Sequence, residues 1–252
     1  MKLNFRKYGE GEPLIILHGL FGSLDNWVTL ANRFSEKRAV YAVDQRNHGQ
    51  SPHDDEMNYS VMADDLYRFI QDHDLGPSTV LGHSMGGKTA MYFAQKYTEF
   101  CKAIIVVDIG IKDYPPHHQA VLEAFEAIQP ETLESRKQAE ERISPIISDA
   151  GTRQFLLKNL FRRKDGTYGI RANYQVAKKR MADILAPVPK IPVDVPALFI
   201  VGGKSDYIMP EDHDSIRDVF TAAKFVTLDT GHWVQAEDPD GVFEAVENFV
   251  TG

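Results

Sequence analysis

Cysteine is nearly absent from this sequence, which has Cys101 as its single thiol in 252 residues. One cysteine excludes a disulfide within the chain and fits a reducing compartment. Apolar runs are also short, since residues 14–17 and 103–107 fall far below the roughly 20 residues that a membrane-spanning helix needs. The first residues carry no apolar core of a secretory signal. From these absences we expect a soluble, cytoplasmic protein that does not bind a membrane.

Positive charge is likewise limited. Lys and Arg number 28 against 36 Asp and Glu, which gives a formal net charge of −8. A chain of this charge repels phosphate backbones at long range, so we expect no nucleic acid partner. The sequence also lacks an H-E-x-x-H motif and the paired cysteines of structural zinc sites. We therefore expect neither a metal nor another cofactor.

One stretch departs from this acidic balance. Residues 153–180 contain nine Lys and Arg side chains and a single acid, Asp165. Two interpretations are open: the stretch is a solvated helical face, or it attracts an anionic substrate tail such as the phosphates of an acyl-CoA thioester.

Short apolar runs alternate with longer amphipathic stretches along most of the chain. The runs are apolar almost throughout, as strands covered on both faces are, and the stretches have the spacing of helices with one buried face. This alternation predicts an α/β fold with a mostly parallel sheet flanked by helices. Ser60 is the expected N-cap of the second helix. We expect strands at residues 14–17, 39–43, 79–81, 102–107, 197–201 and 225–228, and helices at residues 26–34, 60–73, 87–96, 212–222 and 239–250.

The alternation stops between residues 111 and 195, where the sequence reads as helices only, interrupted by prolines and by Asp165-Gly166. We therefore expect an α/β core formed by residues 1–110 and 196–252, and an inserted helical cap, or lid, formed by residues 111–195. Open α/β sheets bind ligands at the carboxyl ends of their strands, so a cap inserted at this point would roof the site.

A G-x-S-x-G motif, Gly82-His83-Ser84-Met85-Gly86, lies between an expected strand and an expected helix. This is the context of a nucleophile elbow, in which a sharp turn lifts a strained serine hydroxyl above the sheet. The amino terminus of the following helix lies beneath that hydroxyl and favours the negative charge that develops during attack. Ser84 is the predicted nucleophile.

A second motif, residues 18–22 with the sequence His-Gly-Leu-Phe-Gly, follows an earlier strand. Acyl transfer needs two N–H donors for the oxyanion, one of them directly after the nucleophile, here Met85. We assign the second donor to Leu20 of this loop, with Phe21 as the alternative.

A third motif, residues 230–233 with the sequence Thr-Gly-His-Trp, follows the last strand. A serine hydroxyl is a weak nucleophile at neutral pH and needs an adjacent base, most often histidine. The position of His232, after the nucleophile and near a strand's carboxyl end, selects it from the nine histidines as that base.

The acid that would orient His232 has two candidates. Asp206 follows the strand at 197–201, and Asp108 ends the strand at 102–107. Either carboxylate could hold the tautomer of the imidazole and stabilise the imidazolium, so chemistry alone does not choose between them.

Together these motifs resemble those of α/β-hydrolase esterases, and more narrowly those of the bacterial YbfF-type esterases. The matching runs are residues 18–27, 44–52, 82–88, 107–109 and 202–205, of which Asp44-Gln45-Arg46-Asn47-His48-Gly49-Gln50-Ser51-Pro52 is the most specific. The resemblance implies the α/β-hydrolase fold over nearly the whole chain. In the narrower group it implies an acid at the position of Asp108 and a serine at the position of Ser205 that joins the hydrogen-bond network. This chain differs by also having Asp206.

The expected function is hydrolysis of short to medium acyl esters, and of thioesters such as acyl-CoA, by a Ser-His-Asp acyl-enzyme mechanism. The expected partner is a small-molecule substrate, and the expected oligomeric state is a monomer or a homodimer. Two alternatives stay open. The same triad could act on another bond, as in C–C hydrolases, aminopeptidases and perhydrolases, or the chain could be a hydrolase-fold binding protein without turnover.

Overall fold

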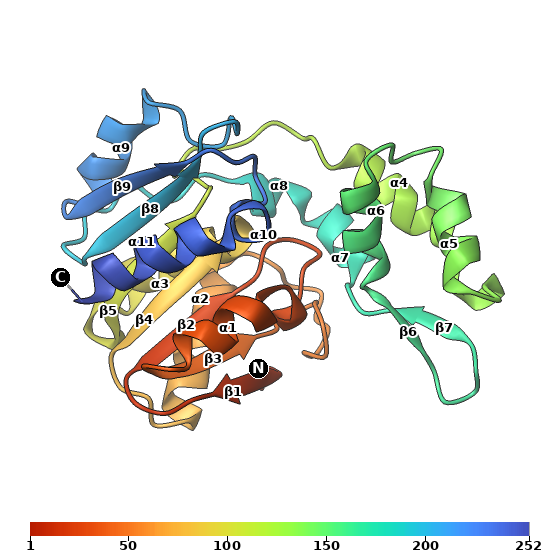
Figure 1. Cartoon of the computed structure of the whole chain (residues 1–252), viewed down its shortest axis with the longest axis horizontal. Helices are drawn as coiled ribbons and strands as arrows, with labels where there is room; N and C mark the ends of the chain where they lie inside the picture. The colour runs from red at the N-terminus through yellow and green to blue at the C-terminus, as the bar shows by residue number, and fades with distance from the viewer. Residues whose placement is uncertain (252) are drawn as a thin grey trace.

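A computed structural model describes residues 1–251, and a seven-stranded sheet forms its centre (Figure 1). The strands are β1 Phe5–Tyr8, β2 Pro13–Leu17, β3 Ala39–Val43, β4 Ser78–His83, β5 Cys101–Val107, β8 Ala197–Gly202 and β9 Ala223–Leu228. They lie side by side in the order β1-β3-β2-β4-β5-β8-β9. β1 pairs antiparallel with β3, and the other pairs of this sheet are parallel. The predicted mostly parallel sheet is confirmed.

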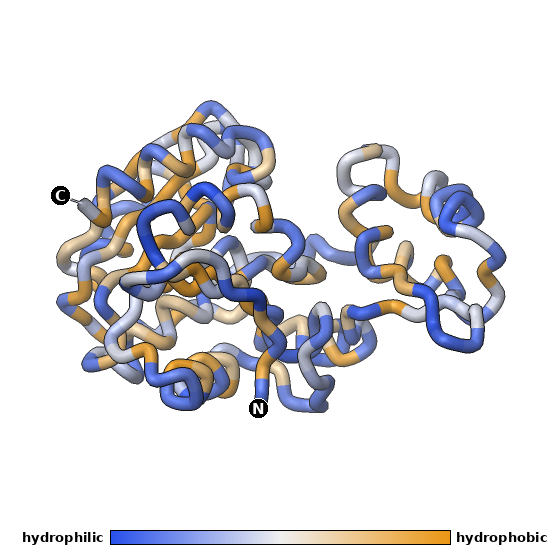
Figure 2. The backbone as a smooth tube through the Cα atoms, turned by 60° about the horizontal axis from the view of Figure 1, so that its bottom comes forward, coloured by the Kyte–Doolittle hydropathy of each residue, from blue (hydrophilic) through white to orange (hydrophobic). Residues whose placement is uncertain are grey.

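Helices cover both faces of the sheet. They are η1 Leu24–Trp27, α1 Val28–Phe34, α2 Tyr59–Asp72, α3 Met85–Lys96, η2 Thr98–Phe100, α9 Asp212–Val219, α10 Val234–Glu237 and α11 Pro239–Thr251. Successive residues of a strand point to opposite faces. Ile15 and Leu17 of β2 accordingly share an apolar cluster with α2, α3 and α9, whereas Leu14 and Ile16 share another with α1 and α11. Figure 2 shows apolar segments of the chain gathered in the middle of the larger body.

Two local features differ from the predictions. The sequence does not predict β1, because its residues are half-buried or exposed at the sheet edge and form no apolar run. The expected cap at Ser60 is wrong. Asn58 caps α2 instead, and its side-chain oxygen accepts a hydrogen bond from the N–H of Val61 at 3.0 Å.

The chain between β5 and β8, residues 111–195, forms a group of elements of its own, which we call the insert (right in Figure 1). Its elements are α4 Gln119–Ile128, η3 Pro130–Thr132, α5 Arg136–Ile143, α6 Ala150–Leu157, β6 Leu160–Arg162, β7 Tyr168–Ile170, α7 Tyr174–Lys179 and α8 Met181–Leu185. Phe125 and Leu156 of the insert share an apolar cluster with Phe21 and Met85, which follow the carboxyl ends of β2 and β4. The insert therefore packs over those strand ends. Among residues 1–251, no helix has both the length and the apolar character needed to cross a bilayer.

The expectation that the insert contains helices only is wrong. β6 and β7 form an antiparallel hairpin in which Leu160 pairs with Ile170. Gly166 turns the hairpin with a φ of 88°, a left-handed conformation that glycine adopts without strain. The sequence carries a signal for this hairpin in Asp165-Gly166, a turn dipeptide between two short β-prone runs.

Lys88 joins both ends of the insert to the sheet body. Its side chain is 1% exposed, and its ammonium donates hydrogen bonds to the carbonyl oxygens of Lys112, at 2.9 Å, and Ala186. Burial lowers the pKa of Lys88 to about 7. One side chain of α3 therefore holds together the segment where the chain leaves the sheet body and the segment where it returns.

We expect Asn58→Ala to lower the free energy of unfolding by about 1 kcal/mol, because the N–H of Val61 then loses its capping acceptor. Ser60→Ala, in the first turn of the same helix, is the matched control and should change stability far less. Urea unfolding of both variants measures the difference. Equal losses would contradict the assignment of the cap.

Candidate active site

Ser84 occupies a strained turn between β4 and α3. Its backbone has φ 52° and ψ −117°, outside the regions that a residue with a side chain ordinarily adopts. The flanking glycines are required by close packing. A Cβ on Gly82 would overlap the carbonyl of Gly86, and a Cβ on Gly86 would lie 2.5 Å from the carbonyl oxygen of Leu17. The G-x-S-x-G pattern is thus explained by backbone contacts on both sides of the serine.

His232, on the loop after β9, contacts a buried carboxylate. Its Nδ1 lies 2.8 Å from Oδ2 of Asp108, a residue with no exposed surface at the end of β5. The other carboxylate oxygen, Oδ1, accepts the N–H of Gly202 at 2.9 Å. The carboxylate therefore fixes Nδ1 of His232 as the protonated nitrogen and leaves Nε2 as an acceptor.

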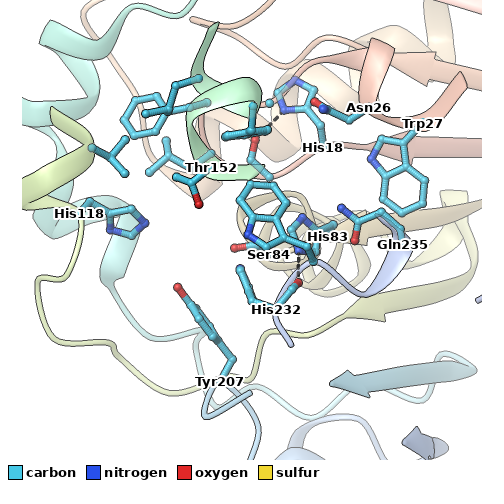
Figure 3. A pocket seen from close by; sticks show the side chains of 18 of the residues that line it. His18, Asn26, Trp27, His83, Ser84, His118, Thr152, Tyr207, His232 and Gln235 are labelled. Atoms are coloured by element: carbon cyan, nitrogen blue, oxygen red, sulfur yellow. Dashed lines mark hydrogen bonds between the residues drawn. The ribbon is translucent and has the colours of Figure 1, made fainter. Parts of the chain in front are cut away.

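Ser84 and His232 line the same cavity of about 220 Å³ (Figure 3). The loop of His232 is held beside the elbow by His83, the residue before the nucleophile. The imidazole of His83 donates from Nε2 to the carbonyl oxygen of His232 at 2.9 Å, and the two rings have centroids 4.8 Å apart. The structure thus brings the predicted nucleophile and base to one site.

The two candidate acids are separated clearly by their positions. Asp108 contacts His232. Asp206 is exposed, and among residues 1–251 it forms no ion pair with the imidazole of His232. Ser205 lies next to it in the chain but faces inward, and its hydroxyl donates to Oδ2 of Asp108 at 2.5 Å. The structure therefore brings Asp108 and Ser205 into the network and leaves Asp206 outside it.

Tyr207 is a site residue that the sequence does not single out. Its ring stacks on the imidazole of His232 with centroids 3.8 Å apart and planes inclined by 13°. Burial raises the pKa of Tyr207 to about 12. Its hydroxyl donates to Nε2 of His117 at 2.5 Å, since Nδ1 of that ring must donate to the carbonyl of Pro115. The signal available in the sequence is only its place two residues after Ser205.

The peptide that joins Gly19 to Leu20, in the loop of residues 18–22, lies close to Ser84. The carbonyl oxygen of Gly19 accepts hydrogen bonds from Nδ1 of His18, at 2.8 Å, and from the N–H of Gly22, at 3.0 Å. Because a trans peptide unit is planar, the N–H of Leu20 must point away from that carbonyl. A Cβ on Gly19 would lie 3.3 Å from the Cβ of Ser84, so this peptide is close to the nucleophile. The N–H of Met85 is the first of α3 and has no partner within the helix.

The N–H of Phe21 is already bonded. It donates to Nε2 of His48 at 3.0 Å, and Nδ1 of the same ring must donate to the carbonyl of Arg46, 2.9 Å away. His18 is held in the same way, because its Nε2 accepts the N–H of Gln45 at 3.1 Å. Burial lowers the pKa of His18 to about 4 and that of His48 to about 3. Both rings are therefore neutral supports of the loop.

The insert also touches this loop. The side chain of Asn159, which is 5% exposed, donates from Nδ2 to the carbonyl oxygen of Phe21 at 2.9 Å. A second contact joins the insert to the loop after β3, where the N–H of Asn173 donates to the carbonyl of Asn47 at 2.8 Å. Both contacts couple the insert to the backbone around the site.

A larger cavity of about 650 Å³ adjoins the first. The two cavities share several wall residues, among them His232, Phe155 and Trp233. Phe155 packs edge-on against Trp233 with ring centroids 4.3 Å apart, so an aromatic pair stands where the cavities meet. Mostly apolar walls with a few polar groups are typical of small-molecule sites.

The basic stretch does not converge on these cavities. Lys158 lines the larger cavity, together with the acidic Asp149 and Glu237. Lys178 pairs with Glu126 at 2.6 Å, elsewhere on the insert. In the described part of the chain, residues 1–251, no group of three His, Cys, Asp or Glu side chains has the arrangement of a metal site.

Comparison with known proteins identifies the class. The family described as alpha/beta hydrolase fold matches residues 12–239 of the sequence. The chain belongs to this family, and the fold implied by its motifs is confirmed. Its relatives there include esterases and lipases.

The individual relatives cover nearly the whole chain. Esterase YbfF of Escherichia coli (strain K12) is 35% identical over 258 residues, which span 99% of both chains. The sn-1-specific diacylglycerol lipase ABHD11 of Mus musculus is 36% identical over 247 residues, covering 94% of this chain and 80% of the relative. A solved structure of a marine microorganism esterase, 42% identical, superposes with a TM-score of 0.96 over 98% of this chain and 99% of its own. The resemblance to YbfF-type esterases is confirmed.

We expect stability to fall between pH 7 and pH 5. In this window an unfolded histidine takes up a proton near pH 6.5, whereas His18 and His48 stay neutral in the fold, so the unfolded state binds more protons. Each such ring lowers the free energy of unfolding by about 2 kcal/mol at pH 5.

The variant His48→Gln tests this expectation by denaturant unfolding at both pH values. Its loss of stability between pH 7 and pH 5 should be about 2 kcal/mol smaller than in the parent protein, whatever its stability at pH 7. The same substitution at the exposed His53 controls for the loss of an imidazole. If His48→Gln lost as much stability between pH 7 and pH 5 as the parent protein, the ring of His48 would have to be charged in the folded protein at pH 5.

Proposed function

We propose that the protein is a serine carboxylic-ester hydrolase with Ser84 as nucleophile, His232 as general base and Asp108 as the acid of the triad. The observation that carries the proposal is the 2.8 Å contact between His232 and the buried Asp108, on a cavity that Ser84 lines. A general base needs a fixed tautomer and a neighbouring nucleophile. The contact with Asp108 supports the first, and the place of Ser84 on the same cavity supports the second. The esterase and lipase relatives support the same class of reaction.

The reaction has two halves. Nε2 of His232 takes the hydroxyl proton of Ser84 as the oxygen attacks the acyl carbonyl. The N–H groups of Leu20 and Met85 stabilise the resulting oxyanion. His232 gives the proton to the leaving alcohol, and an acyl-enzyme remains on Ser84. Water activated by the same imidazole then releases the acid.

The groups behind the base have separate roles in this proposal. Asp108 holds the ring orientation and stabilises the imidazolium, and Ser205 holds the carboxylate through the bond at 2.5 Å. Phe21 does not serve as an oxyanion donor, because its N–H is bonded to His48. Asp206 has no part in the reaction.

We propose that the insert is the lid of the site and that residues 1–110 and 196–252 form the catalytic core. Val121, Thr152, Phe155 and Leu156 of the insert line the 220 Å³ cavity. These side chains shield the reacting carbonyl from water, which strengthens the interactions with the oxyanion.

Thioesters belong to the proposed range because the same acyl-enzyme steps apply to a thiol leaving group. The basic stretch gives acyl-CoA little support as the substrate, since Lys158 is its one member on the larger cavity within residues 1–251 and shares that wall with two acids. We therefore place uncharged esters first.

Ser84→Ala should abolish covalent labelling by a fluorophosphonate and the burst of p-nitrophenol from p-nitrophenyl acetate, because no other hydroxyl lies at the elbow. Ser144→Ala, an exposed serine of the insert, is the control and should keep both signals. A parent protein that releases no p-nitrophenol above the uncatalysed background would indicate a binding protein of this fold. Labelling that persists in Ser84→Ala would exclude Ser84 as the nucleophile.

Asp108→Asn should lower kcat by roughly 10³- to 10⁴-fold, because an amide in place of the carboxylate no longer holds the reactive tautomer of His232. Asp206→Asn, on the exposed neighbouring loop, should leave kcat within about twofold. Steady-state hydrolysis of p-nitrophenyl acetate compares the two. The reverse ranking would move the acid to Asp206.

A further inference from the structure

We propose that the site is selective for esters of short acids with large apolar alcohols: the acyl group binds in a small cavity on the oxyanion side of Ser84, and the leaving group in the larger cavities on the His232 side. This inference rests on the proposed esterase function and assigns the two ends of the substrate.

Ser84 lies between two cavities of very different size. One is the 220 Å³ cavity already described. The other has a volume of about 20 Å³ and is walled by apolar side chains that include Met85, Ile109 and Ile184. A substrate whose carbonyl carbon is at the serine oxygen can therefore extend in two directions.

The chemistry assigns the direction. His232 lines both large cavities but not the small one. The leaving oxygen must receive its proton from this ring, so the alcohol departs through the large cavities. Leu20 lines both the small cavity and the 220 Å³ cavity, whereas Met85, the other proposed oxyanion donor, lines the small cavity and neither of the large ones. Because the alcohol occupies the large cavities, the acyl chain must occupy the small one.

The volumes then limit each group. A cavity of about 20 Å³ holds little more than one water-sized group, which corresponds to the methyl or ethyl group of a short acid. On the other side the 220 Å³ and 650 Å³ cavities adjoin at Phe155 and Trp233 and accept a group many atoms longer.

The small cavity is held at this size by buried hydrogen bonds. The hydroxyl of Tyr59, another of its wall residues, donates to the carbonyl oxygen of Ile184 at 2.6 Å. Lys88 binds the carbonyl of Ala186, two residues further along, and lies 4.8 Å from the ring centre of Tyr114, which also lines the cavity. Widening the cavity would break contacts among buried polar groups, which is costly in a close-packed interior.

Two isomeric esters test the inference without a change in composition or overall hydrophobicity. Octyl acetate places a short acid on a long alcohol, and methyl nonanoate does the opposite. We expect kcat/KM for octyl acetate to exceed that for methyl nonanoate by at least about 100-fold, because the nonanoyl chain exceeds the small cavity by several methylene groups. Equal values, or a preference for methyl nonanoate, would overturn the inference.

Paired variants test the walls separately. Ile184→Ala enlarges the small cavity alone and should raise kcat/KM for p-nitrophenyl butyrate relative to p-nitrophenyl acetate by about tenfold. Leu156→Ala enlarges the 220 Å³ cavity instead and should leave that ratio unchanged while altering the preference among acetate esters of different alcohols. An effect of Leu156→Ala on the acyl ratio would reverse the assignment of the two sides.

The failure of this inference is distinguishable from a failure of the proposed function. If the protein shows the p-nitrophenol burst but prefers the long acid, the esterase proposal stands and the assignment of the cavities is wrong. If neither isomer is hydrolysed and no burst appears, the esterase proposal itself fails.

Discussion

Direct contact between backbones at the carboxyl ends of β2 and β4 is the constraint on which the site depends. Gly86 lies against the carbonyls of Leu17 and His18, and Gly82 lies against Gly86, with no side chain between them. The first turn of α3 can therefore approach the loop of residues 18–22. In the proposed mechanism that approach sets the N–H groups of Leu20 and Met85 beside Ser84 before any substrate binds, which is the preorganisation that electrostatic catalysis requires.

The histidines near Ser84 fall into two groups, which differ in the hydrogen bonds of their ring nitrogens. Both nitrogens of His18 and of His48 are used by backbone groups, one as donor and one as acceptor, so a proton on the second nitrogen would face an N–H. His232 differs, because one nitrogen is held by Asp108 and the ring lines a cavity. A histidine with one committed and one open nitrogen can exchange a proton without disturbing the fold.

Much of this arrangement could be predicted from sequence because it is encoded locally. The buried parallel strands are short apolar runs, and the elbow is a five-residue motif between a strand and a helix. The choice between Asp108 and Asp206 could not be made this way, because it depends on how β5 pairs with β8. Val107 pairs with Ile200, and this register places Asp108 beside the N–H of Gly202 and within reach of His232. Tyr207, Asn159 and β1 were out of reach for the same reason, since their roles arise from contacts between segments far apart in sequence.

The polar contacts of the insert bear on how enzymes of this architecture could diverge. Asn159 binds the carbonyl of Phe21, and Asn173 binds that of Asn47, so the insert is fitted to two core loops through main-chain atoms as well as through apolar packing. A foreign insert without a donor at the position of Asn159 would leave the Phe21 carbonyl without its buried partner beside the candidate site. The contact at Asn173 is less demanding, because its backbone N–H is present in every residue except proline. Exchange of this segment between relatives, in evolution or in the laboratory, is therefore constrained to inserts that carry a side-chain donor at the position of Asn159 or to grafts that move the loop of Phe21 with them.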